Sequence, residues 1–247
     1  MKVLVCISKT PDTTAKIAFT EGNTKFDENG VQWIINPYDE WYSLVRAIEL
    51  KEKDANVTIL LVTVGAADAE PIIRKALALG GDEAIRVNNT SNDSMVVAQE
   101  IAAIAKEGAY DLILTGKETI DYNSASIGSM LCALLDTIFI PNAIALDMNG
   151  NIATIKREID GGEETCETTL PIILSCQKGM AEQRIPNMRG IMAARTKPLK
   201  VVEATIKNAN TTIKKFDTPP AKSGVKLVDA GNMDELVRLL KEEAKVI

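Results

Sequence analysis

The chain has 247 residues, and 28 Lys and Arg against 34 Asp and Glu give it a formal net charge of −6. Its hydrophobic fraction of 46% is enough to bury a core, and its mild acidity disfavours general nucleic-acid binding. The absence of histidine excludes histidine-based catalytic triads, HExxH zinc sites and histidine-ligated haem.

Short apolar runs alternate with helical patterns over the first 140 residues. The predicted strands span residues 2–7, 56–64, 84–87 and 110–115. The predicted helices span residues 37–53, 69–79, 93–107 and 124–135, with Asn36 as the N-cap of the first and Pro37 at its first helical position. Near-continuous apolar strands that alternate with helices predict a doubly wound, mostly parallel, Rossmann-like α/β sheet.

Two regions depart from this alternation. Residues 13–35 contain turn signals between short apolar runs and predict an irregular hairpin excursion. After Pro141, residues 151–159 and 165–176 alternate as strands do around a turn at residues 160–162.

After Thr196, the hydrophobic patterns that are typical of packed helices and strands become sparse. Residues 218–224 read as an extended linker, and an amphipathic helix over residues 233–243 follows. We therefore expect a domain over residues 1–195 and a C-terminal arm over residues 196–247. The arm must pack on something to bury its apolar stripe, which consists of Leu236, Val237, Leu239 and Leu240.

The cysteines bear on metal binding and on the compartment. Cys6, Cys132, Cys166 and Cys176 form no CxxC pair, so we expect no zinc site or other metal site. Scattered single cysteines are typical of buried thiols in a reducing compartment. With no signal-peptide pattern and no long apolar segment, we expect a cytoplasmic protein without membrane insertion.

Ligands of parallel sheets bind beyond the carboxyl ends of the strands, so the loops there are the candidate sites. These loops are residues 6–9, 64–66 and 116–128. The last is rich in small and polar residues and enters a helix, whose N-terminus suits a phosphate. It matches neither the Walker A nor the GxGxxG pattern, so a βα loop with nothing bound remains the alternative.

A second candidate site is a basic stretch that also contains methionines, which we expect to be exposed. Its members are Arg184, Ile185, Met188, Arg189, Ile191, Met192, Arg195 and Lys197. Flexible apolar side chains between arginines are typical of a docking loop. A core helix with a basic edge is the alternative.

Several blocks, in this order and spacing, carry a resemblance to a known family. They are VLVCISKTPDT at residues 3–13, NPYDE at 36–40, ALALGGD at 76–82, GKETID at 116–121, KREIDGGEET at 156–165 and LPIILS at 170–175. Together they resemble the beta subunit of electron transfer flavoprotein, including its FixA-like relatives, over nearly the whole chain. Cys166 stands where the family usually has an aliphatic residue.

The resemblance implies a non-catalytic subunit of a heterodimer with a larger alpha subunit. The alpha subunit holds most of one redox FAD, which the beta subunit helps to enclose. Such a heterodimer carries electrons from acyl-CoA dehydrogenases or related flavoenzymes to a quinone reductase or another acceptor. The beta subunit holds AMP in the ordinary class. In the electron-bifurcating class it holds a second FAD, which accepts hydride from NADH.

The resemblance also assigns residues by family position. The nucleotide shell comprises Cys6, Asn36, Pro37, Tyr38, Asp39, Val64, Gly116, Asp121, Asn123, Ser124, Ala125, Ser126 and Ile127. The partner-docking residues are Met188, Arg189, Ile191 and Met192, within a recognition loop over residues 183–195.

This chain departs from the family at several shell positions. Ile127 lacks a hydroxyl that relatives often carry, Thr13 replaces a tyrosine that faces the flavin in some relatives, and Tyr122 replaces a smaller residue. Tyr122 fills space that a flavin ring needs, and the segment at residues 223–227 is close to the ordinary class. Both features favour AMP over FAD. A third alternative is an ATP-binding domain like a universal stress protein, which needs no arm.

Overall fold

The computed structural model of the chain describes residues 1–206, 208–221 and 224–247. The strands are β1 Lys2–Cys6, β2 Lys9–Pro11, β3 Phe19–Thr20, β4 Lys25–Phe26, β5 Trp33–Ile35, β6 Thr58–Val64, β7 Glu83–Asn88, β8 Leu112–Gly116, β9 Ile138–Asn149, β10 Ile152–Ile159, β11 Gly162–Thr169, β12 Ile172–Cys176 and β13 Leu199–Glu203. The helices are α1 Glu40–Lys53, η1 Ala67–Ala69, α2 Glu70–Leu79, α3 Ser94–Gly108, α4 Ile127–Leu135, α5 Met188–Ala194, α6 Met233–Arg238 and η2 Leu239–Ala244.

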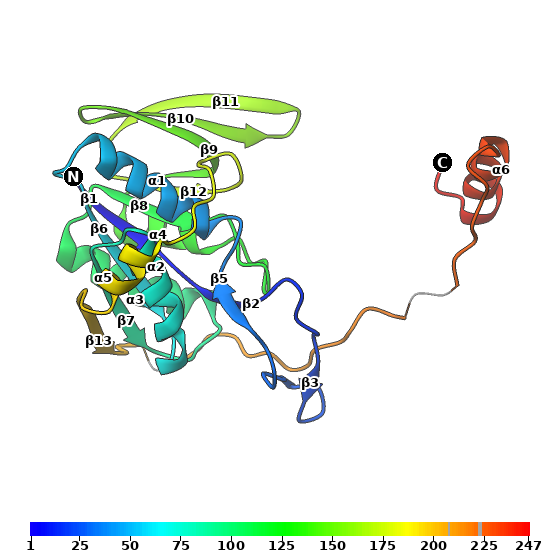
Figure 1. Ribbon diagram of the computed structural model, residues 1–247, viewed down its shortest axis with the longest axis horizontal. Coiled ribbons are helices and arrows are strands. Elements are labelled where there is room, and N and C mark those ends of the chain that lie inside the picture. Colours follow the sequence, from blue (N-terminus) through cyan, green and yellow to red (C-terminus); the bar gives the residue numbers. More distant parts are fainter. Residues whose placement is uncertain (207, 222–223) are drawn as a thin grey trace.

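A nine-stranded sheet forms the centre of the described chain (Figure 1). Its strand order is β11-β10-β9-β12-β8-β1-β6-β7-β13. Adjacent strands are parallel across the set β9, β12, β8, β1, β6, β7 and β13. The strands β10 and β11 are antiparallel to their neighbours and form a hairpin at one edge. This topology confirms the predicted doubly wound α/β fold.

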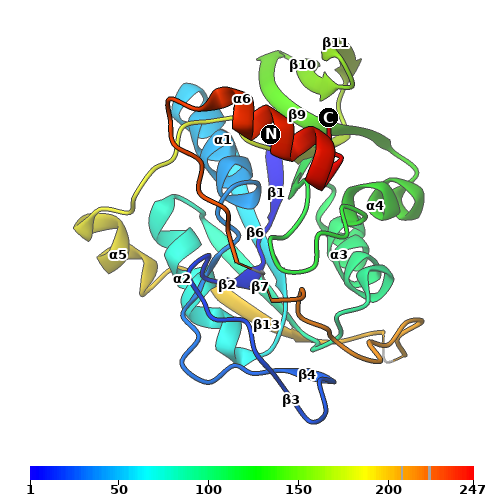
Figure 2. The same ribbon diagram turned by 90° about the vertical axis from the view of Figure 1, so that its right-hand side faces the viewer.

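Helices cover both faces of the sheet, because successive strand residues point to opposite sides. Val3 and Val5 of β1 belong to an apolar cluster that includes residues of α1 and α2. Leu4 and Cys6 belong to a second cluster that includes residues of α3 and α4. Figure 2 shows the two pairs of helices on opposite sides of the strands.

The order of the strands reverses between β1 and β8. The chain passes from β1 to β6 and β7 on one side, then returns to place β8 against the other side of β1. A crevice outside the carboxyl ends of β1 and β8 is therefore the place where this class of fold binds ligands.

Two predicted helix starts are wrong. The first helix begins at Glu40 with Asp39 as its N-cap, because the side chain of Asn36 bonds instead to the loop after β8. The fourth begins at Ile127 rather than at residue 124. Asn123 and Ala125 both have a φ of 49°, which is a left-handed conformation that a right-handed helix cannot include.

The irregular hairpin excursion predicted over residues 13–35 is confirmed in part: β3 pairs with β4 within it, whereas β5 pairs with β2, which precedes residue 13. Three of its aromatic side chains form a row that extends to the arm. The ring of Phe19 stacks on that of Phe216 with a centroid separation of 4.7 Å, and Phe26 lies edge-on between Phe19 and Trp33. The excursion therefore supports the path of the arm.

The first part of the predicted arm is tied to the domain. β13 pairs with β7 as the edge strand of the sheet. Beyond it, the carboxylate of Glu100 accepts hydrogen bonds from Thr205 and Ile206, and that of Asp93 accepts from Asn210 and Thr211. Residues beyond β13 thus follow a path set by two acidic side chains of α3 and its N-cap.

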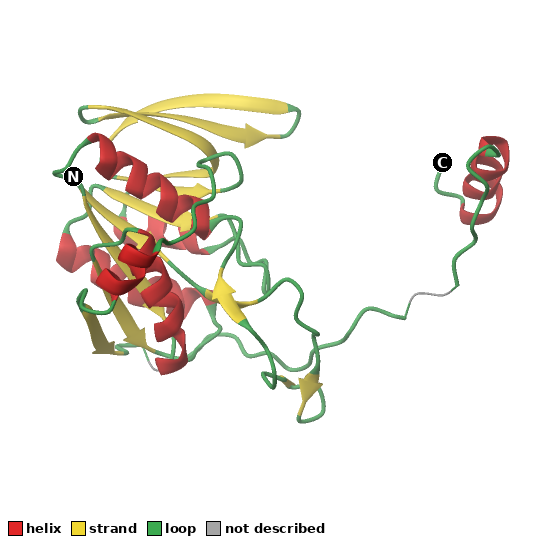
Figure 3. Cartoon of the chain, in the orientation of Figure 1, coloured by secondary structure: helices red, strands yellow, loops and turns green. Residues whose placement is uncertain are grey.

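The end of the arm stands apart from the sheet (Figure 3). The predicted linker over residues 218–224 includes Lys222 and Ser223, which lie outside the described residues, as does Ser223 of the segment at residues 223–227. The last predicted helix forms as α6 and continues directly into η2. Within the described ranges, no helix combines the length and apolarity needed to cross a membrane.

Candidate functional site

Two predicted candidate loops meet at the reversal point of the sheet. Ser8 follows β1, and residues 117–126 follow β8, which is the direct neighbour of β1. Val64 ends β6 on the other side of β1, and the loop after β6 lies at the same edge. The loops that the sequence analysis selected therefore lie at one edge of the sheet, where its strand order reverses, and we call this place the crevice.

The start of α1 fastens the loop after β8. The side-chain amide of Asn36 donates to the carbonyl of Glu118 at 2.7 Å and accepts from the backbone N–H of Ile120 at 3.2 Å. Oδ2 of Asp39 accepts from the backbone N–H of Glu118 at 3.0 Å. Asn36 is fully buried, so these bonds also satisfy polar atoms that water does not reach.

Glu40 fastens the loop after β1. Its Oε2 accepts from the backbone N–H of Ser8 at 2.5 Å, and its Oε1 lies 2.7 Å from Oγ of Ser8. The side chain is only 5% exposed. Gly116 permits this packing, because a Cβ at that position would lie 2.8 Å from Cγ of Glu40. The start of α1 therefore holds both loops of the crevice.

We call Asn36, Asp39 and Glu40, which hold these two loops, the clamp. The carboxyl groups of Asp39 and Glu40 have shifted pKa values. Burial raises the pKa of Glu40 to about 8, against hydrogen bonds from Ser8 that lower it, and Asp121 and Asp39 raise it further. Burial also raises the pKa of Asp39. At neutral pH, Glu40 is therefore mainly a neutral acid.

The helix that leaves the crevice has an open N-terminus. Ser126 is the N-cap of α4 but makes no side-chain bond to the first turn, whose N–H groups have no carbonyl partner within the helix. By contrast, Asp93 caps α3 by accepting from the N–H groups of Met95 and Val96. The left-handed residues Asn123 and Ala125 just before α4 are typical of a backbone site for anions.

The other residues assigned to the nucleotide shell lie in the turn before α1, in the loop before α4 and at the end of β1. Pro37 and Tyr38 lie in the turn before α1, and Tyr38 is exposed. In the loop before α4 the predicted residues are open to solvent: Asp121, Asn123, Ser124 and Ala125 are exposed, and Ile127 is half-buried. Cys6, at the end of β1, is buried, and this burial raises the pKa of its thiol. Their role in binding stays a prediction.

Three residues that organise the crevice were absent from the assigned shell, although one of them, Ser8, lay in the candidate loop at residues 6–9. Glu40 and Ser8 form the bonds described above, and Asn92 donates to the hydroxyl of Tyr122 at 3.0 Å. Glu40 had a signal in the sequence, because an acid two residues after the Asn-Pro-Tyr turn falls in the first turn of a helix. No sequence pattern indicated the bond from Asn92, because it lies 30 residues before Tyr122 in the chain.

The predicted docking stretch forms a small exposed helix, α5. Met188 is 73% exposed and Met192 66%, whereas Ala194 is the only residue of this helix that is buried. Ile191 and Arg189 are exposed as well. Apolar side chains that face solvent do not fit the alternative of a core helix with a basic edge.

The base of this helix is held firmly. Arg184 donates two hydrogen bonds to the carboxylate of Glu52, at 2.7 and 3.0 Å, and its carbonyl accepts from the indole of Trp41. Gly190 lets α5 approach α2, because a Cβ there would lie 2.3 Å from the carbonyl oxygen of Ala78. A rigid base presents Met188 and Met192 without a large ordering cost.

Comparison with known proteins gives one consistent result. A family model described as an electron transfer flavoprotein domain matches residues 23–207. Electron transfer flavoprotein subunit beta of Bacillus subtilis strain 168 is 38% identical to this chain, with 100% of both chains covered. The same subunit of Syntrophomonas wolfei is 36% identical, covering 100% of this chain and 98% of the relative. The mitochondrial subunit of Arabidopsis thaliana is 29% identical, with 100% of both covered.

We predict that Glu40→Gln stabilises the protein more at pH 8 than at pH 5. The native state keeps the Glu40 proton up to a pKa of about 8, whereas the unfolded chain loses it near 4.5. Stability of the wild type should therefore fall across this window, by up to roughly 1.4 kcal/mol per pH unit, and glutamine does not titrate. Chemical denaturation of both proteins at the two pH values measures the difference.

Substitution of an exposed residue that does not titrate, Ile138→Ala, provides the control and should change stability equally at both pH values. An equal stability difference between wild type and Glu40→Gln at pH 5 and pH 8 would show that Glu40 is ionised throughout.

Proposed function

The chain belongs to the beta-subunit family of electron transfer flavoproteins, and on that premise we propose that it forms a heterodimer that carries electrons between flavoenzymes. In this proposal the chain performs no chemistry of its own. It binds AMP in the crevice between β1 and β8, and it encloses part of an FAD held by an alpha subunit. The FAD supplies the redox chemistry when bound.

The proposal that this chain binds a nucleotide rests on the open N-terminus of α4, which lies at the reversal point of the sheet. The first-turn N–H groups and the positive end of the helix dipole favour a phosphate. Ser126 leaves these donors without a side-chain cap, and the clamp from Asn36, Asp39 and Glu40 sets the loop that leads to them. Backbone donors replace the side-chain hydroxyl that the chain lacks at Ile127.

Tyr122 supports AMP rather than a second FAD in this crevice. Its hydroxyl accepts a hydrogen bond from Asn92, so the ring bridges the loop before α4 and the loop before α3. In this proposal the ring, held by its bond to Asn92, occupies space beside the phosphate site, and a flavin would need that space. The ring thus disfavours a bifurcating function, in which FAD in this subunit takes hydride from NADH.

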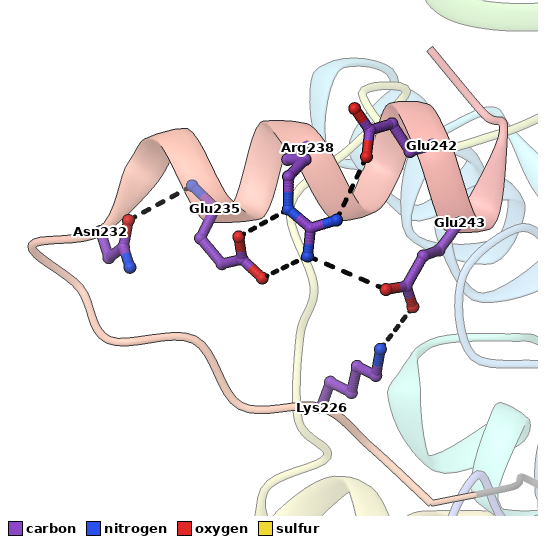
Figure 4. Close-up of polar contacts among 6 residues, drawn as sticks. All are labelled: Lys226, Asn232, Glu235, Arg238, Glu242 and Glu243. Atoms are coloured by element: carbon purple, nitrogen blue, oxygen red, sulfur yellow. Dashed lines mark hydrogen bonds and ion pairs between the residues drawn. The ribbon is translucent and has the colours of Figure 1, made fainter.

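The arm supports assembly with a partner subunit. Met233, Leu236 and Val237 of α6 are 52%, 36% and 51% exposed. The polar side of this segment is already paired (Figure 4): Arg238 bonds to Glu235 and Glu242, and Glu243 bonds to Lys226. A helix can pack on another protein when it exposes an apolar stripe and its polar side chains already pair with one another. We assign this stripe to the alpha subunit.

The exposed end of α5 supports docking of a flavoprotein dehydrogenase, of which acyl-CoA dehydrogenases are our first choice. Met188, Ile191 and Met192 supply adaptable apolar contacts, and Arg189 supplies positive charge to steer an acidic partner. A quinone reductase or another acceptor would then take the electrons onward. The family match to residue 207 extends past the length of a universal-stress-type domain, about 150 residues, and does not support that alternative.

Ser126→Asp should abolish AMP retention in the purified heterodimer without harming the fold. An N-cap aspartate accepts from the same N–H groups that the phosphate needs, and it stabilises the helix by about 1 kcal/mol. It also repels phosphate by about 4 kcal/mol at 4 Å and an effective dielectric near 20. Chromatography of nucleotides released by acid measures the loss. Ser126→Ala, which carries neither a charge nor a capping group, is the control, and AMP content of Ser126→Asp equal to that of the wild type would place the phosphate elsewhere.

Met188→Ala should slow flavin reduction by an acyl-CoA dehydrogenase about tenfold or more at sub-saturating carrier. Truncating an interface hot spot costs about 2 kcal/mol, and about 1.4 kcal/mol is one decade. The melting temperature should hardly change, since the side chain is 73% exposed. Ile138→Ala, an exposed apolar side chain at the start of β9, serves as control. Normal transfer with lowered stability would refute the docking role.

Truncation after Thr218 should weaken assembly of the heterodimer. The deletion removes α6, whose apolar side chains are each worth roughly 1.5–3 kcal/mol when buried on a partner. Size-exclusion chromatography over a dilution series measures the effect. Lys241→Ala is a surface control in the same segment. Unchanged dissociation of the truncated heterodimer on dilution would show that the arm contributes nothing to assembly.

A further inference from the structure

The helix that carries the exposed methionines is too short to be stable by itself. α5 spans seven residues, Met188–Ala194, and isolated helices shorter than about 12 residues are marginal in water. Ala194 is the one side chain of this helix that is buried, so little apolar burial holds it in place. Formation of α5 must therefore depend on contacts from outside the helix.

Two cations supply such contacts at the carboxyl end of α5. Nη1 of Arg74, on α2, donates to the carbonyl of Ala194 at 2.8 Å and to that of Lys197 at 2.6 Å. Nζ of Lys197 donates to the carbonyl of Leu77 at 2.9 Å and to that of Gly81 at 2.5 Å. A side chain of α2 thus caps the end of α5, and a side chain that follows α5 caps the end of α2. We call these four bonds the clasp.

The clasp uses positive charge differently from the docking surface. Arg74 and Lys197 are half-buried, and burial lowers the pKa of Lys197. Their donors point to the last carbonyls of two helices, where the helix dipole favours a cation. Arg189 of α5 is exposed instead. Positive charge near α5 therefore holds the helix in one case and faces solvent in the other.

The start of α5 is capped from within its own segment. The side chain of Asn187 accepts from the backbone N–H of Gly190 at 2.8 Å. This cap favours a helix but does not determine where the helix lies. Its place on α2 is set by the close approach of Gly190 to the carbonyl of Ala78 and by the clasp.

We propose that Arg74 and Lys197 are positioning residues for the docking of a partner flavoprotein, because the clasp keeps α5 formed and fixed on α2. The exposed methionines then meet the partner already ordered. This inference rests on the proposed docking function of α5. Without the clasp, α5 is formed in only a fraction of the molecules, and the apparent affinity for the partner falls by that fraction.

Hydrogen exchange of the purified heterodimer, followed by mass spectrometry, tests the clasp without any partner dehydrogenase. Arg74→Met keeps an apolar stem and removes the donors. Amides of residues 191–196 donate within the helix and its last turn. Their exchange should become at least about tenfold faster and approach that of an unstructured segment, while exchange in α3 stays unchanged. Lys197→Met removes the other half of the clasp and should act in the same way.

Reduction of the carrier by an acyl-CoA dehydrogenase tests the functional part. Arg74→Met should raise the KM for the carrier about tenfold, since a helix formed in about one molecule in ten lowers the apparent affinity by that factor. The limiting rate at saturating carrier should not change, because the formed helix docks as in the wild type.

Arg189→Met is the matched variant, because it removes an arginine from α5 itself. It should leave exchange of residues 191–196 unchanged and weaken the dependence of KM on salt, since an exposed charge steers the encounter. Arg74→Met should keep the salt dependence of the wild type.

Wild-type exchange of residues 191–196 in both clasp variants would overturn the inference, and so would an unchanged KM in a variant whose α5 exchanges rapidly. Equal acceleration in α3 would also overturn it, because the cations would then support the whole fold. These results leave the proposed function intact. Normal electron transfer by Met188→Ala contradicts the docking function instead, and the inference falls with it.

Discussion

The crevice depends on one constraint, which is that the start of α1 must touch both strands at which the sheet reverses. Asn36 and Asp39 bond to the loop after β8, and Glu40 bonds to the loop after β1. These bonds form only if the backbone at the end of β8 comes close to α1, which Gly116 allows. A larger residue there would separate the two loops and leave buried polar groups without partners.

The same scaffold keeps the crevice and the contact surfaces apart. The crevice is built from buried strands and from the side chains of Asn36, Asp39 and Glu40, whereas α5 and α6 present apolar side chains at the periphery. Asp93 and Glu100 fix the root of the arm to α3, and Phe216 farther along stacks on Phe19. The last helix, α6, lies beyond both attachments. Substitutions on either surface should therefore leave the crevice undisturbed.

Pattern alone predicted the alternation of strands and helices, because buried parallel strands are apolar throughout and helices repeat every 3.6 residues. It did not predict the helix starts at Glu40 and Ile127, which depend on long-range bonds from Asn36 and on left-handed residues at Asn123 and Ala125. The candidate loops followed from the rule that ligands of parallel sheets bind beyond the carboxyl ends of the strands. The partners of Glu40 did not, since Ser8 lies 32 residues away in the chain.

The central claim is that the crevice between β1 and β8 holds AMP while a partner subunit holds FAD. The most direct measurement is the amount of each nucleotide released by acid from the purified heterodimer, relative to protein. The account predicts one AMP and one FAD per heterodimer. Two FAD without AMP would contradict it and would indicate the bifurcating class.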